Sequence, residues 1–277
     1  QYGVELFGDI SAYGAGGVSI STVDGNIVAN AGTTLFGYYG VSLTANTTYG
    51  VGAADDYGQI SVGRITTSLS NISFGGVSLA ADGDVLAGNI NAYGTAISYG
   101  VTLTSVDGRD ASVGDVDAAS LTLSGIDSFS ADSITIRSSE IGDSFFNAAS
   151  SFTVTGALTS GRGADIRTAS GDISIGSISL SNGALSLYAS DASNMGADIT
   201  VGAISVGNAV VQIYAADNIT LNGDINTVSG NVFVTADYEA GDTTGDAIGS
   251  IHTTSSDYTI TATNVALRAT EGITAYA

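Results

Sequence analysis

The sequence predicts an all-β protein, a right-handed parallel β-helix (β-solenoid) with roughly 20–26 residues per coil and a few longer loops. Three observations support this prediction. The composition favours strands over helices, similar strands recur along the chain, and few places have the sequence of a two-residue hairpin turn.

The composition offers little material for helices. Among its 277 residues the chain has 38 Gly and no Pro, Cys or Trp, and all six basic residues are Arg. Glu occurs only at Glu5, Glu140, Glu239 and Glu271. Ser, Thr, Val, Ile and Tyr favour strands, whereas Gly, Asn and Asp favour corners. A hydrophobic fraction of 44% argues against a disordered chain.

One type of strand recurs as an alternation of apolar residues with Ser or Thr. The central apolar residues of its copies are Ile20, Leu43, Leu79, Leu103, Leu123, Val154, Leu187, Ile213, Val234 and Ile260. Most successive copies are 20–26 residues apart, and three longer intervals predict inserted loops. A second strand type, such as GDISIGSI at 171–178, follows most of these copies.

A β-sandwich would also contain many short strands with glycine-rich corners. A solenoid is favoured because similar strands recur at the same point of each repeat, so that similar strands would stack on one another in successive coils. The absence of Lys and Pro, which block edge strands, fits a solenoid that exposes only its two end coils. Crossover chirality favours right-handed winding. No linker or change in composition divides the chain, so we predict a single β-solenoid domain over residues 1–277.

The formal net charge of −21 argues against two classes of partner. Such a surface repels nucleic acid and anionic membranes. The chain also lacks the run of about 18 apolar residues that a membrane-spanning helix needs. With one His and no Cys, it has little material for a zinc site. We therefore expect neither nucleic-acid binding nor membrane insertion.

A carbohydrate-active enzyme must be considered, because parallel β-helices often carry polysaccharide lyases and hydrolases. Such sites need clustered carboxylates with basic partners. Asp115 and Asp117 would share one face of a strand, and Asp55–Asp56 and Asp82–Asp84 are further pairs. Acid pairs are common among 27 acids, however, and Asp also favours corners. The arginines before the last coil do not repeat in phase; they are Arg64, Arg109, Arg137, Arg162 and Arg167.

Other residue types give weaker signals. His252, Asp257 and the nearby serines could be combined into a Ser/His/Asp set, but the G-x-S-x-G context is missing, so we expect a solvated corner histidine. Tyr188 and Tyr214 are predicted to point outward, where they could stack on sugars or pack against a neighbouring molecule. We therefore predict no catalytic residues, with a carbohydrate-active β-helix enzyme or a carbohydrate-binding module as the alternative.

The most acidic segment, DYEAGDTTGD, contains Asp237, Glu239, Asp242 and Asp246. Carboxylate oxygens are the ligands that calcium prefers. The spacing matches neither an EF-hand loop nor the GGxGxDxUx repeat. These four residues are therefore a speculative calcium site, and calcium is the one cofactor that the sequence suggests.

The stretches ASGDISIGSISLSNGALSLYASD and AADNITLNGDINTVSGNVFVTAD resemble the coils of filamentous-haemagglutinin-type adhesins, the two-partner secretion exoproteins of Gram-negative bacteria. The likeness is best over residues 171–251. It implies a right-handed β-helix, export to the cell surface, and a role in adhesion or matrix cohesion. The Asn-Pro signature of that family's secretion domain is missing, since the chain has no Pro. The chain also begins at Gln1, so we expect a segment of a longer exoprotein or a free filament subunit.

Together these observations predict a non-catalytic, extracellular β-solenoid: an adhesin shaft, a biofilm-matrix protein or a self-assembling surface filament subunit. The expected location is the outside or the surface of a Gram-negative bacterium. Its terminal coils have open backbone edges and no evident cap, so we expect end-to-end self-association. Surface glycans or matrix polysaccharide are further expected partners.

Overall fold

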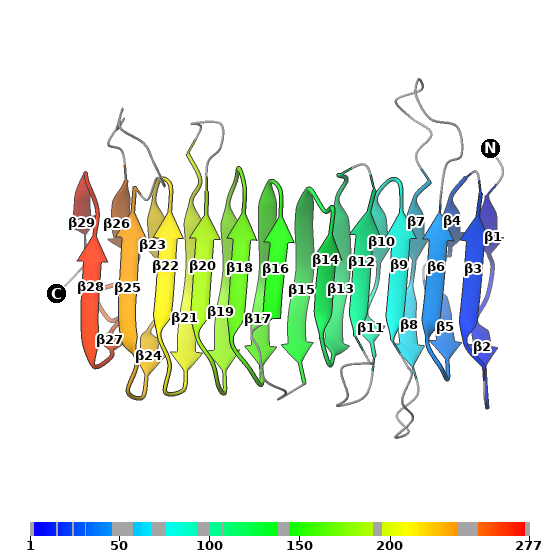
Figure 1. The fold of residues 1–277 in the computed structure, drawn as a ribbon, viewed down its shortest axis with the longest axis horizontal. Helices are drawn as coiled ribbons and strands as arrows, with labels where there is room; N and C mark the ends of the chain where they lie inside the picture. The colour runs from blue at the N-terminus through cyan, green and yellow to red at the C-terminus, as the bar shows by residue number, and fades with distance from the viewer. Residues whose placement is uncertain are drawn as a thin grey trace. The chain divides into compact units, whose positions relative to one another are not determined.

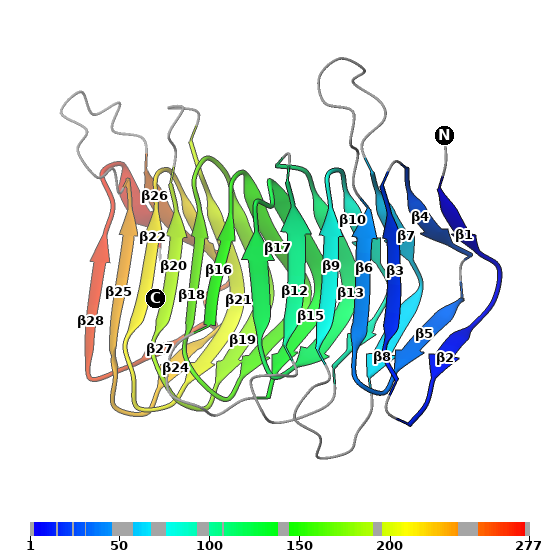
Figure 2. The same ribbon diagram turned by 45° about the vertical axis from the view of Figure 1, so that its right-hand side comes forward.

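A computed structural model confirms the all-β class and the parallel β-solenoid (Figures 1 and 2). The residues that the structure describes are 3–14, 16–23, 25–30, 32–45, 58–67, 76–92, 100–106, 108–137, 144–190, 196–237 and 249–274. These ranges contain strands and no helix. The chain forms two compact units, Gln1–Ser139 and Glu140–Ala277, each of which is a stack of coils. The expectation of a single domain over 1–277 stays a prediction.

In unit 1 each coil has three walls, and each wall is a parallel sheet. The first wall contains β1 (Val4–Leu6), β4 (Ile27–Ala29), β7 (Ile60–Val62), β10 (Val85–Ala87) and the first halves of β13 (Ala111–Ala118) and β15 (Ser128–Ile136). The second wall contains β2 (Ile10–Ala12), β5 (Thr34–Gly37), β8 (Arg64–Thr67), β11 (Ile90–Asn91) and the second halves of β13 and β15. The third wall contains β3 (Val18–Thr22), β6 (Val41–Ala45), β9 (Val77–Ala81), β12 (Val101–Ser105) and β14 (Leu121–Ser124).

Unit 2 repeats this plan. Its first wall contains β17 (Ser151–Ser160), β19 (Ile173–Leu180), β21 (Ile199–Val206), β23 (Ile219–Leu221), β26 (Ser250–Thr253) and β29 (Gly272–Thr274). The second wall contains the later parts of β17, β19 and β21, followed by β24 (Ile225–Thr227) and β27 (Ile260–Thr261). The third wall contains β16 (Ser144–Ala148), β18 (Ala164–Thr168), β20 (Leu185–Ala189), β22 (Val211–Ala215), β25 (Asn231–Ala236) and β28 (Asn264–Arg268).

The core consists of identical or similar apolar residues stacked on successive coils. Ile173, Ile199 and Ile219 are register partners on the first wall, and all three are fully buried. In unit 1, Leu43 and Leu79 stack in the same way on the third wall. Full burial of such a side chain contributes roughly 1.5–3 kcal/mol. The alternation in the sequence therefore places a continuous apolar column inside each unit.

The coils wind in the right-handed sense. In Figure 1 the third-wall strands of unit 1 run upward on the near side, and the strands behind them run downward. Successive coils of the unit advance from right to left in the same view. An upward course in front combined with this advance is a right-handed helix, as chain crossovers in parallel sheets favour.

The coil lengths agree with the predicted 20–26 residues and a few longer loops, apart from one shorter coil of 18 residues. First-wall partners in unit 1 lie 23, 33, 25, 26 and 18 residues apart, from Val4 to Phe129. In unit 2 they lie 21, 26, 20, 32 and 22 residues apart, from Phe152 to Ile273. Apart from one register shift between Val154 and Ala157, the paired strands stay in register, so most of the variation in length falls between the strands.

Two copies of the predicted strand type do not lie on the third wall with the other copies. Val154 lies in β17 and pairs with Ile175 on the first wall. Ile260 lies in β27 and pairs with Ile225 on the second wall, whereas Leu267 is the third-wall partner of Val234. The prediction was wrong here because all three walls have the same apolar and polar alternation, which does not identify the wall.

Glycine occupies the corner between the first and second walls on successive coils. A Cβ atom on Gly88 would lie 3.0 Å from the carbonyl oxygen of Gly63 on the preceding coil. A Cβ atom on Gly202 would overlap the carbonyl oxygen of Gly176. The backbones of neighbouring coils therefore approach too closely at this corner for a larger residue.

Candidate functional site

In unit 2, the acids at the corner before the first wall bind the backbone of the next coil. Asp172 Oδ1 accepts a hydrogen bond from the Asp198 N–H at 2.9 Å, and Asp198 Oδ1 accepts one from the Asn218 N–H at 2.9 Å. Asn218 Oδ1 in turn accepts from the N–H and the hydroxyl of Ser250, at 3.1 and 2.6 Å. Each side chain satisfies a backbone donor that would otherwise need water. We call this series the corner ladder of unit 2.

Unit 1 has a corner ladder at the equivalent position. Asn26 Oδ1 accepts from the Gln59 N–H at 2.8 Å. Asp84 Oδ1 accepts from the Asp110 N–H at 3.3 Å, and Asp110 Oδ1 accepts from the Ser128 N–H at 3.2 Å. The ladders explain part of the acidity of the chain, because Asp, Asn and Ser are the residues whose short side chains reach a neighbouring backbone group.

Asp115 and Asp117 share the outward face of β13, as predicted. Asp115 accepts hydrogen bonds from Ser133 Oγ at 2.6 Å and from Asn89 Nδ2 at 3.1 Å. Asp117 forms an ion pair with Arg137 on the next coil. Both carboxylates are thus engaged by neighbouring coils. Of the other predicted pairs, Asp84 belongs to the corner ladder of unit 1, and Asp55–Asp56 lies outside the described residues.

His252 is half-buried in β26, in register with Thr220 and Thr274. Asp257 is exposed, and its N–H donates a hydrogen bond to Ser255 Oγ at 3.2 Å. The histidine therefore lies within a strand, and the expectation that it occupies a corner was wrong. The sequence places it directly after Ile251, which is buried, so the alternation turns it outward.

Of the four residues in the speculative calcium site, the structure describes only Asp237. This residue has a positive φ of 62°, a conformation in which Asp is enriched among non-glycine residues. Its Oδ2 accepts a hydrogen bond from Thr270 Oγ1 at 2.7 Å. Glu239, Asp242 and Asp246 lie outside the described residues. Among the described part of the chain, no three His, Cys, Asp or Glu side chains come together as a metal site.

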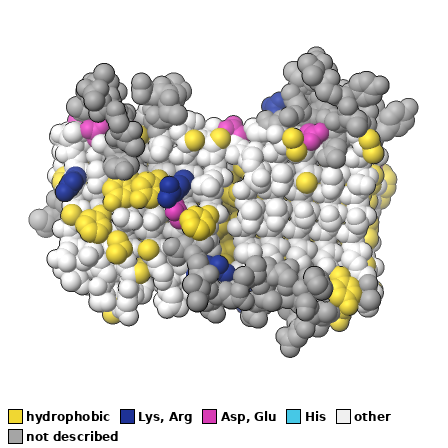
Figure 3. Space-filling view, in the orientation of Figure 1, with side chains coloured by type: hydrophobic (Ala, Val, Ile, Leu, Met, Phe, Trp, Pro, Cys, Tyr) yellow, Lys and Arg dark blue, Asp and Glu magenta, His cyan; other side chains and the backbone are white. Residues whose placement is uncertain are grey.

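The third wall of unit 2 carries a stack of outward side chains, coloured in Figure 3 over β18, β20 and β22. Asp165 accepts two hydrogen bonds from the Arg167 guanidinium, both at 2.8 Å, and these bonds raise the pKa of Arg167 above its usual value. Arg167 lies over the ring of Tyr188, 4.8 Å from its centroid. Tyr188 stacks on Tyr214 with ring centroids 4.9 Å apart. We call these four residues the Arg–Tyr stack.

The side chains of the Arg–Tyr stack lie one above another along the solenoid axis, so the tyrosine rings face each other and not the solvent. Arg167, Tyr188 and Tyr214 are register partners on successive strands. Guanidinium–aromatic and stacked aromatic contacts are both favourable. One face of the Tyr188 ring is covered by Arg167 and the other by Tyr214. Both tyrosines point outward as predicted, but the Tyr188 ring offers an edge rather than a face to a ligand.

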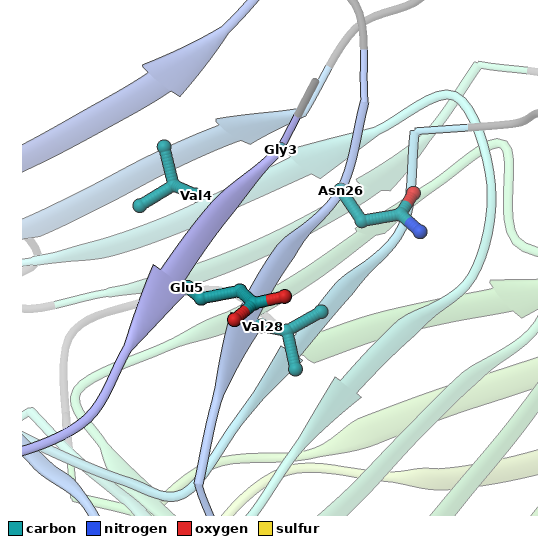
Figure 4. Close-up of a pocket in the computed structure, with 5 residues that line it drawn as sticks. All are labelled: Gly3, Val4, Glu5, Asn26 and Val28. Carbon is teal, nitrogen blue, oxygen red and sulfur yellow. The ribbon is translucent and has the colours of Figure 1, made fainter. Parts of the chain in front are cut away.

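Two hollows lie on the described surface, and neither is lined by more than one acidic residue. The first is lined by Gly3, Val4, Glu5, Asn26 and Val28 at the start of unit 1 (Figure 4). Glu5 is the one ionisable residue of this lining set, and Asn26 Oδ1 is already bonded to the Gln59 N–H. The second hollow lies beside the Arg–Tyr stack and is lined by Asn147, Ala148, Arg167, Thr168, Ala169, Tyr188 and Ser190.

Sequence reasoning identified the outward acids and tyrosines but not their partners. Arg137, Ser133 and Arg167 were missed because each acts across coils, and coil lengths decide which residues meet. Within the described ranges, no helix is both long and apolar enough to cross a membrane.

Comparison with known proteins found no matching family model, no matching curated protein and no matching solved structure. The likeness to filamentous-haemagglutinin-type adhesins therefore remains a resemblance of short stretches.

Proposed function

We propose that the chain is a non-catalytic structural or adhesive β-solenoid, acting as an adhesin shaft, a biofilm-matrix protein or a surface filament subunit. One observation carries this proposal: outward polar side chains of one coil bind the backbone or the side chains of the next coil. The corner ladders and the Arg–Tyr stack follow this rule. Such side chains stabilise the stacking of coils, which is the property that a load-bearing solenoid needs.

The same contacts weigh against the alternative of a carbohydrate-active enzyme. A general acid and a nucleophile or base must both face the substrate. Asp115 is occupied by Ser133 and Asn89, and Asp117 by Arg137. A carbohydrate-binding module is also less favoured, since a sugar ring packs on an aromatic face and both faces of Tyr188 are covered.

The proposed location is the cell surface or extracellular matrix of a Gram-negative bacterium, on the basis of the resemblance. Matrix polysaccharide is the proposed external partner, and calcium at the acidic segment remains part of the proposal for Asp237, Glu239, Asp242 and Asp246.

End-to-end self-association is proposed from the last coil of unit 2. Val265 and Ile273 are 45% and 44% exposed, whereas their register partners Val232 and Ile251 are 0% and 1% exposed. Stacking another coil on this edge would bury both side chains and satisfy the open backbone groups. A head-to-tail contact of this kind propagates as a filament.

The test combines a polysaccharide panel with immunoelectron microscopy of cells that produce the chain. We expect no turnover of any polysaccharide and antibody labelling on surface fibres or matrix. Turnover that is lost in Asp115→Asn or Asp117→Asn, at an unchanged thermal midpoint, would make the enzyme the better assignment. Label confined to the cell interior would contradict the surface function.

A further inference from the structure

The third wall of unit 1 differs sharply from that of unit 2 in what it presents to solvent. Its outward positions form two columns of small side chains. One column is Ser19, Ser42, Ser78, Thr102 and Thr122, and the other is Ser21, Thr44, Ala80, Thr104 and Ser124. We call these ten residues the hydroxyl face.

The register of the hydroxyl face is uninterrupted over five coils. Ser42 pairs with Ser78, Ser78 with Thr102, and Thr102 with Thr122. Neighbouring strands lie about 4.7–4.9 Å apart, and residues i and i+2 on one strand lie about 6.6 Å apart. The outward positions that carry the hydroxyls therefore form a nearly rectangular grid with these two backbone repeats.

The hydroxyl face differs from the corner ladders in its hydrogen bonding. Among the described contacts, none of its nine hydroxyls makes a side-chain hydrogen bond, whereas the ladder residues Asp198 and Asn218 are bonded to the next coil. No bulky side chain interrupts the grid, which appears in Figure 3 as rows of uncoloured side chains over β6, β9 and β12.

The hydroxyl face is also uncharged in a chain with a formal net charge of −21. None of its ten positions is ionisable, although 27 acids are available. The fold does not impose this composition, because the equivalent positions of unit 2 include Asp165, Arg167 and Tyr188. The complementary partner is neutral, flat and able to exchange hydrogen bonds at regular intervals.

We propose that the hydroxyl face of unit 1 binds the surface of ice crystals. The repeat across the strands is close to an oxygen–oxygen repeat of hexagonal ice, and the repeat along the strands is about a tenth shorter than the ice repeat in the perpendicular direction. Water held by regularly placed hydroxyls can join such a lattice, and each bridging water is nearly as favourable as a direct hydrogen bond. The methyl groups of Thr44, Thr102 and Thr104 order the water between the hydroxyls further.

Ice fits this surface better than a protein or a polysaccharide does. Protein interfaces are anchored by aromatic residues and Arg in buried pockets, and the ten positions contain neither. Sugar-binding surfaces use aromatic faces, which are equally missing from these positions. The two alternative partners that the experiment must exclude are a second molecule of this protein and crystalline cellulose.

The experiment measures ice shaping and inhibition of ice recrystallisation by the full chain. The disruptive variant is Thr102→Lys, inside the grid between Ser78 and Thr122. The matched control is Ser186→Lys, an outward position on the third wall of unit 2 with the same place in its strand. The gain-of-function variant is Ala80→Thr, which supplies the one missing hydroxyl between Thr44 and Thr104. Circular dichroism and thermal midpoints check that each variant is folded.

The expected result is ice shaping by the wild type, loss in Thr102→Lys to the level of an inert protein, retention in Ser186→Lys and increased inhibition in Ala80→Thr. Absence of ice shaping in the folded wild type overturns the proposal. Equal activity in wild type and Thr102→Lys overturns it as well. Dimerisation or cellulose binding that Thr102→Lys abolishes, without any effect on ice, assigns the face to that alternative partner instead.

Discussion

The ring of Tyr188 stacks on the ring of Tyr214, one coil further along the chain, with centroids 4.9 Å apart and ring planes 20° apart. Arg167 covers the opposite face of Tyr188 from the preceding coil. The three side chains thus connect three successive third-wall strands through contacts on the outer surface of unit 2. These contacts stabilise the stacking of the coils in addition to the buried apolar core.

Replacing Tyr214 with Ala should lower the free energy of unfolding by about 1 kcal/mol beyond the effect of lost buried area, since a stacked aromatic pair contributes about 0.5–1.5 kcal/mol. Urea denaturation followed by circular dichroism measures the change. Val228→Ala is the control, because Val228 is 79% exposed. Equal stability of the two variants would show that the ring contact is energetically neutral.

Asp198→Ala removes the acceptor for the Asn218 N–H and should cost about 1–3 kcal/mol, because a half-buried donor loses its partner. Asp198→Asn keeps the Oδ1 acceptor and should stay close to the wild type. Asp257→Ala, at an exposed position, is the matched control. The thermal midpoint of unfolding reports all three. A loss in Asp198→Asn as large as that in Asp198→Ala would mean that charge, rather than the hydrogen bond, is what matters.

Gly202→Ala places a methyl group on the carbonyl oxygen of Gly176, so neighbouring coils must move apart. We expect a destabilisation of about 1–3 kcal/mol, the usual cost of overpacking. Gly8→Ala is the control, since a Cβ atom there has no neighbour within 4 Å. Chemical denaturation of both variants measures the difference. If Gly202→Ala leaves the free energy of unfolding unchanged, the two coils can move apart at this corner without cost.

Val265→Lys combined with Ile273→Lys should weaken end-to-end association, because charged side chains on an open edge block strand pairing. Sedimentation velocity over a range of protein concentrations measures this effect. Val106→Lys, at a position that is 66% exposed in unit 1, serves as the control. If the wild type stays monomeric at all concentrations, or if the double variant associates equally well, the last coil is not the contact.

The sequence predicted the fold class well because inward residues repeat with a period of two within every strand. Ile213, the central apolar residue of its strand, is fully buried, and so is Val211 two residues before it. The wall of a strand was harder to predict, as Val154 and Ile260 show. Their strands have the same alternation as third-wall strands, and only the lengths of the corners determine where they lie.

For the candidate sites, the sequence predicted the direction of side chains within one strand but not their partners on neighbouring coils. The outward direction of Asp115 and Asp117 follows from their spacing in β13. Their partners Ser133 and Arg137 depend on a coil of 18 residues, from Ala111 to Phe129, that no local pattern specifies. The hydroxyl face did have a sequence signal: outward positions of the third-wall strands up to Ser124 are Ser, Thr or Ala, whereas Tyr188, Gln212 and Tyr214 occupy such positions later.

The corner ladders also have a direction. In both units the side-chain acceptor belongs to the earlier coil and the backbone donor to the later one, as in Asn26 to Gln59 and Asp172 to Asp198. If the chain folds from its amino terminus, each new coil therefore finds the acceptor side chains already in place on the coil before it. If the chain folds from its carboxyl terminus, the backbone donors of each folded coil have no acceptor until the next coil towards the amino terminus has folded.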